Sequence, residues 1–341
     1  MKEKRITTGA YIKDIDKDEK SLRPKYLSEF IGQDKLKENL KVFVTASKER
    51  DDTLDHVFFS GPPGLGKTTL AGIIANEMGV EFRATSAPAL EKQGDLAAIL
   101  STIGEKNVFF IDEIHRLRPQ VEEILYSAME DYEIDVIIGQ GPGARTIKVP
   151  ISPFTLIGAT TKAGLVSAPL YSRFGITARL DFYSICNIKE IIYRSSSILK
   201  VDIEDNAAEK IAICSRGTPR IANRLVRRMR DFAQVLGDNI INIEIVKQGF
   251  SSLEIDDAGL DKVDRKILKS IIDKYGGGPV GSETLAISIS EAVDTLEDIY
   301  EPYLIQEGFL KRTSRGRVVT SKAYKHLGID HKNDENQQLL F

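Results

Sequence analysis

The sequence has few cysteines, no excess of charge of one sign and no long apolar run, and each absence excludes a class of protein. Cys186 and Cys214 are the only cysteines among 341 residues, and neither has a CxxC or CxxH neighbourhood. We therefore expect no disulfide framework and no zinc site, and we expect both residues to be buried, inert thiols. The 47 Lys and Arg against 50 Asp and Glu give a formal charge of -3, so the overall charge selects no partner.

The lack of long apolar runs bears on the cellular location. No stretch approaches the ~18 apolar residues that are needed to span a bilayer. The first twenty residues, MKEKRITTGAYIKDIDKDEK, are too charged for a signal peptide. These two observations predict a cytoplasmic protein that does not associate with membranes.

The first half of the chain alternates short apolar runs with helical patterns. Runs rich in β-branched and aromatic residues occur at 56–60, 80–84, 107–112, 154–160 and 176–182. Continuous apolar strands separated by helices indicate a parallel sheet with helices on both faces. We therefore expect an α/β domain built on a five-stranded parallel sheet.

The second half has a different pattern, because the strands stop after Phe182 and helical patterns follow to about residue 250. Beyond a linker, three helical patterns precede two short strands around a Gly-containing turn, and these are the parts of a winged helix. We expect a large α/β domain at 21–182, a small helical domain at 183–253 and a winged-helix domain at 254–328. The polar ends, 1–20 and 329–341, are predicted to be a mobile arm and a tail.

The stretch GPPGLGKTT, from Gly61 to Thr69, is the most informative part of the sequence. It fits the phosphate-loop pattern GxxxxGK[ST], with an apolar strand before it and a helical pattern after it. Its glycines let backbone N–H groups point at phosphate oxygens, and the start of the helix adds partial positive charge. Lys67 would reach the β and γ phosphates of a nucleotide, and the hydroxyl of Thr68 would hold Mg²⁺.

A pair of carboxylates ends the third apolar run, in VFFIDE. At the carboxyl edge of a parallel sheet, where such sheets bind ligands, Asp112 would support Mg²⁺ and Glu113 would polarise the attacking water. His115 is favoured as a structural side chain, because Glu113 already fills the role of base. At the end of the fourth run, Thr161 or Thr160 would contact the γ-phosphate.

Two arginines and a basic cluster lie outside these motifs. Arg173, in LYSRFGI, and Arg220, in GTPRIANR, lie at predicted domain edges, where a charge-neutralising arginine would come from, although each also fits an ordinary surface arginine. Six basic side chains and no acidic one occur between Gly308 and His326: Lys311, Arg312, Arg315, Arg317, Lys322 and Lys325. They fall on or beside the predicted wing, where they would either meet a DNA phosphate backbone or form a solvated basic edge.

With these motifs in order, the chain resembles the AAA+ ATPases and, more narrowly, the RuvB family, whose members are bacterial motors of Holliday-junction branch migration. The resemblance spans residues 22 to 320 and rests on LRPKYLSEFIGQ, GPPGLGKTTLA, FFIDEIHRL, IGATTKAGL, YSRFGI, GTPRIANRL and GFLKRTSRGRV. The first three segments occur in looser form in many AAA+ proteins. Far fewer AAA+ proteins combine DEIHRL, the pair GATTKAG and YSRFGI, and the winged-helix ending.

The resemblance implies an ATP site with Mg²⁺ that is shared between subunits. The residues that would hold the nucleotide within one subunit are Leu22, Arg23 and Tyr183 at the adenine, and Gly64, Lys67, Thr68 and Thr69 at the triphosphate. Arg220 would be a sensor that closes on its own subunit's ATP, and Arg173 would be a finger that reaches a neighbour's ATP. Glu130, Asp131 and Tyr132 would face the nucleotide across that subunit border. A finger of this kind implies a ring, and the family form is a homo-hexamer.

The resemblance also implies partners. The segment 134–149, IDVIIGQGPGARTIKV, predicts a hairpin that packs on its own domain or projects from it, and the resemblance makes it the docking surface for RuvA, the junction-binding partner. A RuvC-like resolvase is a further expected partner. Arg312 and Arg317 would contact DNA. ATP hydrolysis would then drive duplex DNA through or past the ring and pull two arms of a four-way junction outward.

Three other functions fit parts of the sequence. A protein-remodelling unfoldase would carry an aromatic pore loop, but the segment after the second run, SAPALEKQGD, has no aromatic residue. A clamp-loader subunit usually carries an SRC finger and a different collar, whereas this chain has YSRFG and a basic wing. A nucleotide-regulated binding module would lack Glu113 or the arginine finger, and neither is missing.

Overall fold

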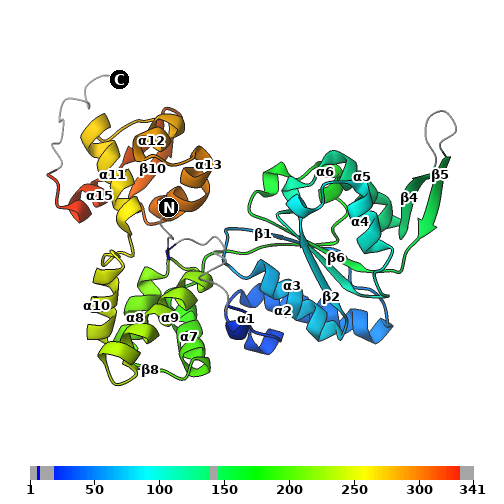
Figure 1. Ribbon diagram of the computed structural model, residues 1–341, viewed down its shortest axis with the longest axis horizontal. Coiled ribbons are helices and arrows are strands. Elements are labelled where there is room, and N and C mark those ends of the chain that lie inside the picture. The colour runs from blue at the N-terminus through cyan, green and yellow to red at the C-terminus, as the bar shows by residue number, and fades with distance from the viewer. Residues whose placement is uncertain (1–5, 8–18, 139–144, 331–341) are drawn as a thin grey trace.

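A five-stranded parallel sheet forms the centre of the large domain (Figure 1). The structure is a computed structural model that describes residues 6–7, 19–138 and 145–330. The strands, in the spatial order β2-β3-β6-β1-β7, are β1 (Val57–Ser60), β2 (Phe82–Ser86), β3 (Val108–Asp112), β6 (Thr155–Thr160) and β7 (Ile176–Arg179). The predicted parallel sheet is confirmed, and its order places the end of β6 between the phosphate loop after β1 and the carboxylates after β3.

Helices cover both faces of this sheet. Val57 and Phe59 of β1 are buried with α2 (Asp34–Arg50) and α3 (Lys67–Met78). Phe58, between them, is buried with α4 (Gln93–Leu100) and α5 (Pro119–Glu130) on the opposite face. Side chains alternate between the two faces of a strand, so a strand that is apolar throughout requires helices on both sides.

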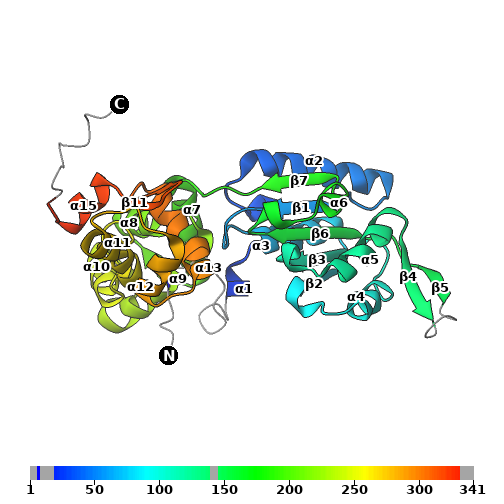
Figure 2. The same cartoon turned by 90° about the horizontal axis from the view of Figure 1, so that it is seen from above.

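The other elements of the large domain are short, apart from a projecting antiparallel pair. They are α1 (Glu19–Leu22), 3₁₀ turns at Leu27–Glu29, Ala87–Ala89, Ile114–Arg116 and Ala163–Leu165, α6 (Ala168–Tyr171), β4 (Glu133–Ile138) and β5 (Arg145–Pro150). Strands β4 and β5 pair from Glu133 opposite Pro150 to Ile138 opposite Arg145. Figure 2 shows this pair at the end of the large domain that is farthest from the other two domains. The tip of the predicted hairpin, 139–144, lies outside the described residues.

The helical domain contains α7 (Ile185–Ile198), α8 (Asp205–Cys214), α9 (Pro219–Leu236) and α10 (Ile243–Ser252). Helix α9 begins at Pro219, where a proline has no N–H bond to lose, and it ends before Gly237. The prediction that strands stop after Phe182 is wrong in one detail, because β8 (Asp202–Ile203) and β9 (Ile240–Ile241) form a short parallel pair. Two-residue strands are too short to produce an alternating pattern that sequence analysis detects.

The winged-helix domain has its own apolar core. Its elements are α11 (Lys262–Tyr275), α12 (Ser282–Ile289), a third helix made of α13 (Val293–Thr295), a π-helix (Leu296–Tyr300) and α14 (Glu301–Gln306), the strands β10 (Leu310–Thr313) and β11 (Gly316–Val319), and α15 (Ser321–Leu327). The sequence predicted the three helices and the wing but not α15. The helical and winged-helix domains lie together at one end of the molecule in both views (Figures 1 and 2).

The predictions for the two ends of the chain stay predictions, and one prediction about the cysteines is wrong. Most of the predicted arm, and the tail after residue 330, lie outside the described residues. Thr7, however, is buried and its hydroxyl donates a hydrogen bond to Asp261 of the winged-helix domain. Cys214 is buried as expected, but Cys186 is exposed, because it lies in the first turn of α7 on the side away from the core. Within the described ranges, no helix is long and apolar enough to cross a membrane.

Candidate active site

The phosphate loop joins β1 to the first turn of α3. Gly66 caps α3 with a φ of +105° and Gly61 has a φ of +133°, which are backbone conformations that glycine adopts without steric cost. A Cβ atom on Gly61 would lie 2.4 Å from the carbonyl oxygen of Leu180, so only glycine fits there. The Nζ of Lys67 donates hydrogen bonds to the carbonyl oxygens of Gly61 at 2.7 Å and of Pro62 at 2.9 Å.

Lys67 is buried and shares a charged cluster with Asp112 and Glu113, the two partly buried carboxyl groups at the end of β3. Burial lowers the pKa of Lys67 to about 8, although the charges of Glu113 and Asp112 oppose the shift. Burial also raises the pKa of Asp112, and the neighbouring charge of Glu113 adds to that effect. Each of these groups would gain from a charged ligand, because phosphate oxygens favour protonated Lys67 and a divalent cation favours ionised Asp112.

Glu113 follows β3 with a φ of +50°, which non-glycine residues rarely adopt and which recurs at functional sites. Its Oε2 accepts a hydrogen bond from the Oγ1 of Thr161 at 3.2 Å and lies 3.3 Å from the Nδ1 of His115. His115 also lies 2.8 Å from the Oγ1 of Thr160. Burial lowers the pKa of His115, so the ring is neutral at neutral pH while its Nδ1 pairs with Thr160 and lies close to Glu113.

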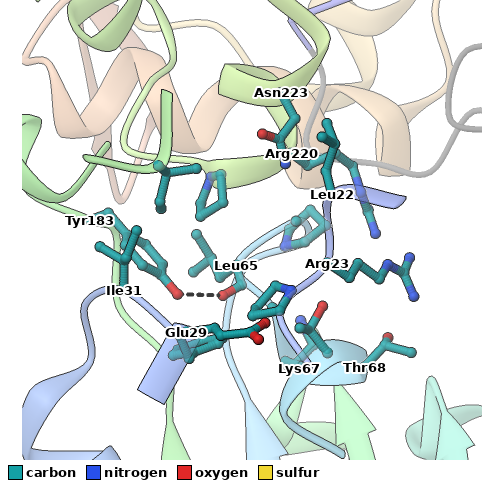
Figure 3. Close-up of a pocket in the computed structure, with 18 of the residues that line it drawn as sticks. Leu22, Arg23, Glu29, Ile31, Leu65, Lys67, Thr68, Tyr183, Arg220 and Asn223 are labelled. Carbon is teal, nitrogen blue, oxygen red and sulfur yellow. Dashed lines mark hydrogen bonds between the residues drawn. The ribbon is translucent and has the colours of Figure 1, made fainter. Parts of the chain in front are cut away.

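One pocket between the large and helical domains collects the residues expected to hold a nucleotide within one subunit (Figure 3). Its lining includes Leu22, Arg23, Gly64, Lys67, Thr68, Thr69, Asp112, Glu113, Thr161, Tyr183 and Arg220. Tyr183, at the junction of the two domains, donates a hydrogen bond from its hydroxyl to the carbonyl oxygen of Leu65 at 3.0 Å. Thr161 lines the pocket, whereas Thr160 is fully buried, and this geometry favours Thr161 as the threonine that faces the γ-phosphate.

Sequence reasoning missed several residues that line the pocket, and three of these are polar or charged: Glu29, Arg194 and Asn223. Arg194, on α7, donates a hydrogen bond to the carbonyl oxygen of Leu22 at 2.6 Å and lies 3.5 Å from Glu29. It therefore ties the helical domain to the segment that lines the pocket. Asn223 lies three residues after Arg220 on α9, so helical spacing predicts it on the same face, but Arg194 belongs to no motif.

The residues of the pocket fit a nucleotide with Mg²⁺. The hydroxyl of Thr68 and the carboxylate of Asp112 are the oxygen ligands that Mg²⁺ prefers. Lys67 and Arg220 bring positive charge to the same pocket. Ile31 lies beside the ring of Tyr183 (Figure 3), and Leu22 adds apolar surface to the same pocket. Apolar surface of this kind suits a flat base.

Arg173 and Glu130 are held together on a different part of the large domain. Neither is among the described residues that line the pocket. The Nη2 of Arg173 lies 3.0 Å from the Oε2 of Glu130, its Nη1 donates to the carbonyl oxygen of Pro169 at 2.7 Å, and its guanidinium lies 4.5 Å from the ring centre of Tyr126. Two of the residues that the resemblance assigns to a neighbour's nucleotide therefore share one surface.

Asp131 and Tyr132, the two residues that follow Glu130, are arranged differently. Asp131 is exposed and Tyr132 is half-buried. The ring of Tyr132 packs edge-on against Phe154, with ring centres 6.2 Å apart. The backbone of Tyr132 has a φ of +52°, so the chain turns sharply as it enters β4.

The wing presents only one of its two predicted DNA contacts to solvent. Arg312 and Arg317 are opposite each other on β10 and β11, but the side chain of Arg312 is 59% exposed and that of Arg317 only 6%. The Nε of Arg317 donates to Glu301 at 2.6 Å and its Nη2 donates to Glu297 at 2.6 Å. The expected surface position of Arg317 is therefore wrong in this structure, because two carboxylates one helical turn apart compensate its burial.

Comparison with known proteins assigns the family. A family model described as the Holliday junction DNA helicase RuvB P-loop domain matches residues 22–180, and models described as the RuvB AAA lid domain and the RuvB C-terminal winged helix domain match residues 183–256 and 257–328. The chain belongs to the RuvB family. This result confirms the resemblance that the motifs indicated.

Relatives and solved structures agree with this assignment to the RuvB family. The chain is 62% identical over 327 residues to the Holliday junction branch migration complex subunit RuvB of Treponema denticola, which covers 96% of this chain and 95% of the relative. The protein of the same name from Borreliella burgdorferi is 58% identical over 329 residues, with coverage of 96% and 95%. A solved structure of the Thermotoga maritima RuvB Holliday junction branch migration motor is 54% identical, with a TM-score of 0.84 and coverage of 91% of this chain and 99% of that one.

Proposed function

We propose that the chain is a cytoplasmic, ATP-hydrolysing motor that moves duplex DNA during Holliday-junction branch migration, as a homo-hexameric ring with a RuvA-like junction-binding partner. One observation carries the proposal: a single chain combines a two-domain pocket, lined by the phosphate loop, Asp112, Glu113 and Arg220, with a winged helix whose wing exposes Arg312. The proposal is further supported by the RuvB P-loop domain, which implies ATPase activity, and by relatives that are subunits of a Holliday junction branch migration complex.

The phosphate loop and β3 would bind the triphosphate and its metal. Lys67 would exchange the carbonyl oxygens of Gly61 and Pro62 for phosphate oxygens, which removes the penalty of its buried charge. Thr68 and Asp112 would hold Mg²⁺, which would neutralise the negative charge of the phosphates. Glu113 would orient the attacking water once its carboxylate is released from Thr161.

Residues from two domains would contact the same nucleotide. ATP hydrolysis would therefore change how the large and helical domains are oriented relative to each other. Arg220 from the helical domain and Lys67 from the large domain line one pocket, so the charge of the ligand sets how closely the two domains approach. Tyr183 lies at the connection between them and contacts the phosphate loop through Leu65. Loss of the γ-phosphate would release Arg220 and change the angle between the domains.

The low pKa of Lys67 predicts that ATP binding depends on pH. Lys67 has a pKa of about 8 before the nucleotide binds, and phosphate oxygens favour its charged form, so the pKa rises on binding. Above about pH 8 the free protein must therefore take up a proton when ATP binds, and the affinity should fall by up to about tenfold per pH unit. Isothermal titration calorimetry at about pH 9, in two buffers with different ionisation enthalpies, measures this uptake. Lys67→Arg stays charged and should show none, so equal uptake by the two proteins would contradict the prediction.

Replacement of each of the two wing arginines should give a different phenotype. Arg312→Ala should fold normally, weaken DNA binding on all sequences and reduce the slope of log affinity against log salt by ~0.9 for the lost phosphate contact. Arg317→Ala should instead destabilise the domain by about 3–5 kcal/mol, because Glu301 would be left buried without its partner. Thermal unfolding and fluorescence anisotropy across a salt series check both variants. An unchanged salt slope for Arg312→Ala would place the DNA contact elsewhere.

The projecting β4–β5 pair is our proposed docking surface for the RuvA-like partner. It lies at the opposite end of the molecule from the wing strands (Figure 2), and none of its described residues lines the pocket. Ile147 on β5 is 47% exposed, and it would supply one apolar contact to a partner on this projecting element. A partner bound there would leave the nucleotide pocket and the wing accessible.

Displacement of a third strand tests the motor function on duplex DNA. A triplex-forming oligonucleotide is annealed to a duplex, and its release is followed after the chain and ATP are added. We expect release that requires hydrolysable ATP, because a translocating ring removes the third strand as it advances. A clamp loader or an unfoldase would hydrolyse ATP and leave the triplex intact.

A further inference from the structure

The winged-helix domain contacts the loop that carries Thr161. Lys162, the next residue, lies with its Nζ 2.8 Å from the Oδ2 of Asp298, in the π-helix of the winged-helix domain. The backbone N–H of Lys162 donates to the Oγ1 of Thr160 at 2.9 Å, so the contact is made at a tight turn. The same turn positions Thr161, whose hydroxyl donates to Glu113.

The contact extends from the turn to the phosphate loop. Ile299 and Pro302 of the winged-helix domain line one groove together with Pro62 and Pro63 of the phosphate loop. Lys162 and Asp298 are each partly exposed, at 35% and 43%. A partly exposed ion pair is too weak to hold two domains together, so its effect is on the orientation of the turn rather than on the stability of the molecule.

The residue before Asp298 faces the wing. Glu297 accepts a hydrogen bond from Arg317 at 2.6 Å, and its Oε1 lies 3.7 Å from the Nη2 of Arg312. Two consecutive carboxylates of one π-helical turn therefore contact different elements. Glu297 contacts the basic wing, and Asp298 contacts the loop beside the nucleotide pocket. π-Helical turns are rare and occur frequently at functional sites.

We propose that Asp298 is a positioning residue of the ATP site, supplied by the winged-helix domain, through which DNA at the wing controls the Thr161–Lys162 turn. The proposal deepens the proposed function and rests on it. Phosphate groups of DNA attract Arg312 away from Glu297, which keeps its hydrogen bond to Arg317, and the π-helix then pivots about that bond. Asp298 moves with it and releases Lys162, and the turn lets Thr161 leave Glu113. Glu113 is then able to orient water, so DNA stimulates hydrolysis.

The test measures kcat and KM for ATP with and without duplex DNA in the full chain. Asp298→Ala and Lys162→Ala should each raise the DNA-free kcat and reduce the stimulation by DNA by about two- to fivefold, the range that a partly exposed ion pair supports. The KM for ATP and the Kd for DNA should stay at their wild-type values, because neither side chain is expected to touch either ligand. The exchanged pair, Lys162→Asp with Asp298→Lys, should restore the stimulation.

Glu307→Ala is the matched control, because it removes another partly exposed ion pair of the same domain, to Lys322 at 3.4 Å, away from the nucleotide pocket. Unchanged stimulation in Asp298→Ala, or an equal loss in Glu307→Ala, would overturn the inference. Failure of the exchanged pair to restore stimulation would also overturn it. If DNA does not stimulate ATP hydrolysis by the wild-type chain, the proposed function is overturned. The wild-type measurements alone give this result, so it is distinguishable from failure of the inference about Asp298.

Discussion

The Glu113→Gln variant is expected to bind ATP with nearly wild-type affinity and to hydrolyse it at least about a hundredfold more slowly. Glutamine keeps the size of the side chain and its hydrogen bond to Thr161, but it cannot accept a proton from the attacking water. Affinity should be retained because Lys67, Thr68 and Arg220, which are expected to bind the phosphates and the metal, are unchanged. Binding of a fluorescent ATP analogue and single-turnover hydrolysis measure the two properties separately.

A control for this variant removes binding rather than chemistry. Lys67→Ala should lose affinity for ATP and hydrolysis together, because its ammonium group contacts the phosphates in the ground state as well as in the transition state. Near-normal turnover by Glu113→Gln would remove Glu113 from the mechanism and would leave His115 as the nearest alternative base.

Two inactive variants are expected to restore activity when they are mixed. Arg173→Ala should reduce hydrolysis by ~10³–10⁵-fold, the effect of an arginine finger that is lost from a phosphoryl-transfer site. Lys67→Ala subunits cannot bind ATP productively but still carry Arg173. In a mixed ring, an Arg173→Ala subunit that receives the finger of a Lys67→Ala neighbour has a complete site. Equal mixing completes about a quarter of the sites, so ATPase activity should recover to about that fraction.

This recovery separates a finger that acts in trans from one that acts in cis. The matched control is a chain with both substitutions, mixed with Lys67→Ala, in which no site has an intact phosphate loop. It should remain inactive. If the mixture of single variants also stays inactive while both assemble into rings, Arg173 serves its own subunit, and its ion pair with Glu130 at 3.0 Å would then be purely structural.

The sequence alone predicted the functional residues wherever function depends on a short, continuous pattern. The phosphate loop and the carboxylates after β3 are fixed by local backbone geometry, so their residues converge in one pocket as the motifs require. The five strands were recognisable because each belongs to a short run with β-branched or aromatic residues, and β1, β3 and β6 are buried on both faces. The third helix and the wing were also visible, since they follow one another along the chain without a long insertion.

The sequence alone did not predict contacts between segments that lie far apart along the chain. Arg317 looked like one more cation of a basic cluster, and nothing near it in the sequence is acidic. Its partners, Glu297 and Glu301, precede it by 20 and 16 residues and reach it only after the wing folds onto the third helix. Arg194 and the pair of Lys162 with Asp298 were missed for the same reason, because ion pairs between domains produce no periodic pattern.

The most direct test of the central claim is ATP-dependent conversion of a synthetic four-way DNA junction into its two duplex products. The reaction would contain the chain with a RuvA-like junction-binding protein, and Lys67→Ala would replace the chain in the blank. We predict rapid conversion that requires ATP and the partner and that is absent from the blank. Robust ATP hydrolysis without junction conversion, with the partner present, would contradict the account and would return the clamp-loader and protein-remodelling functions to consideration.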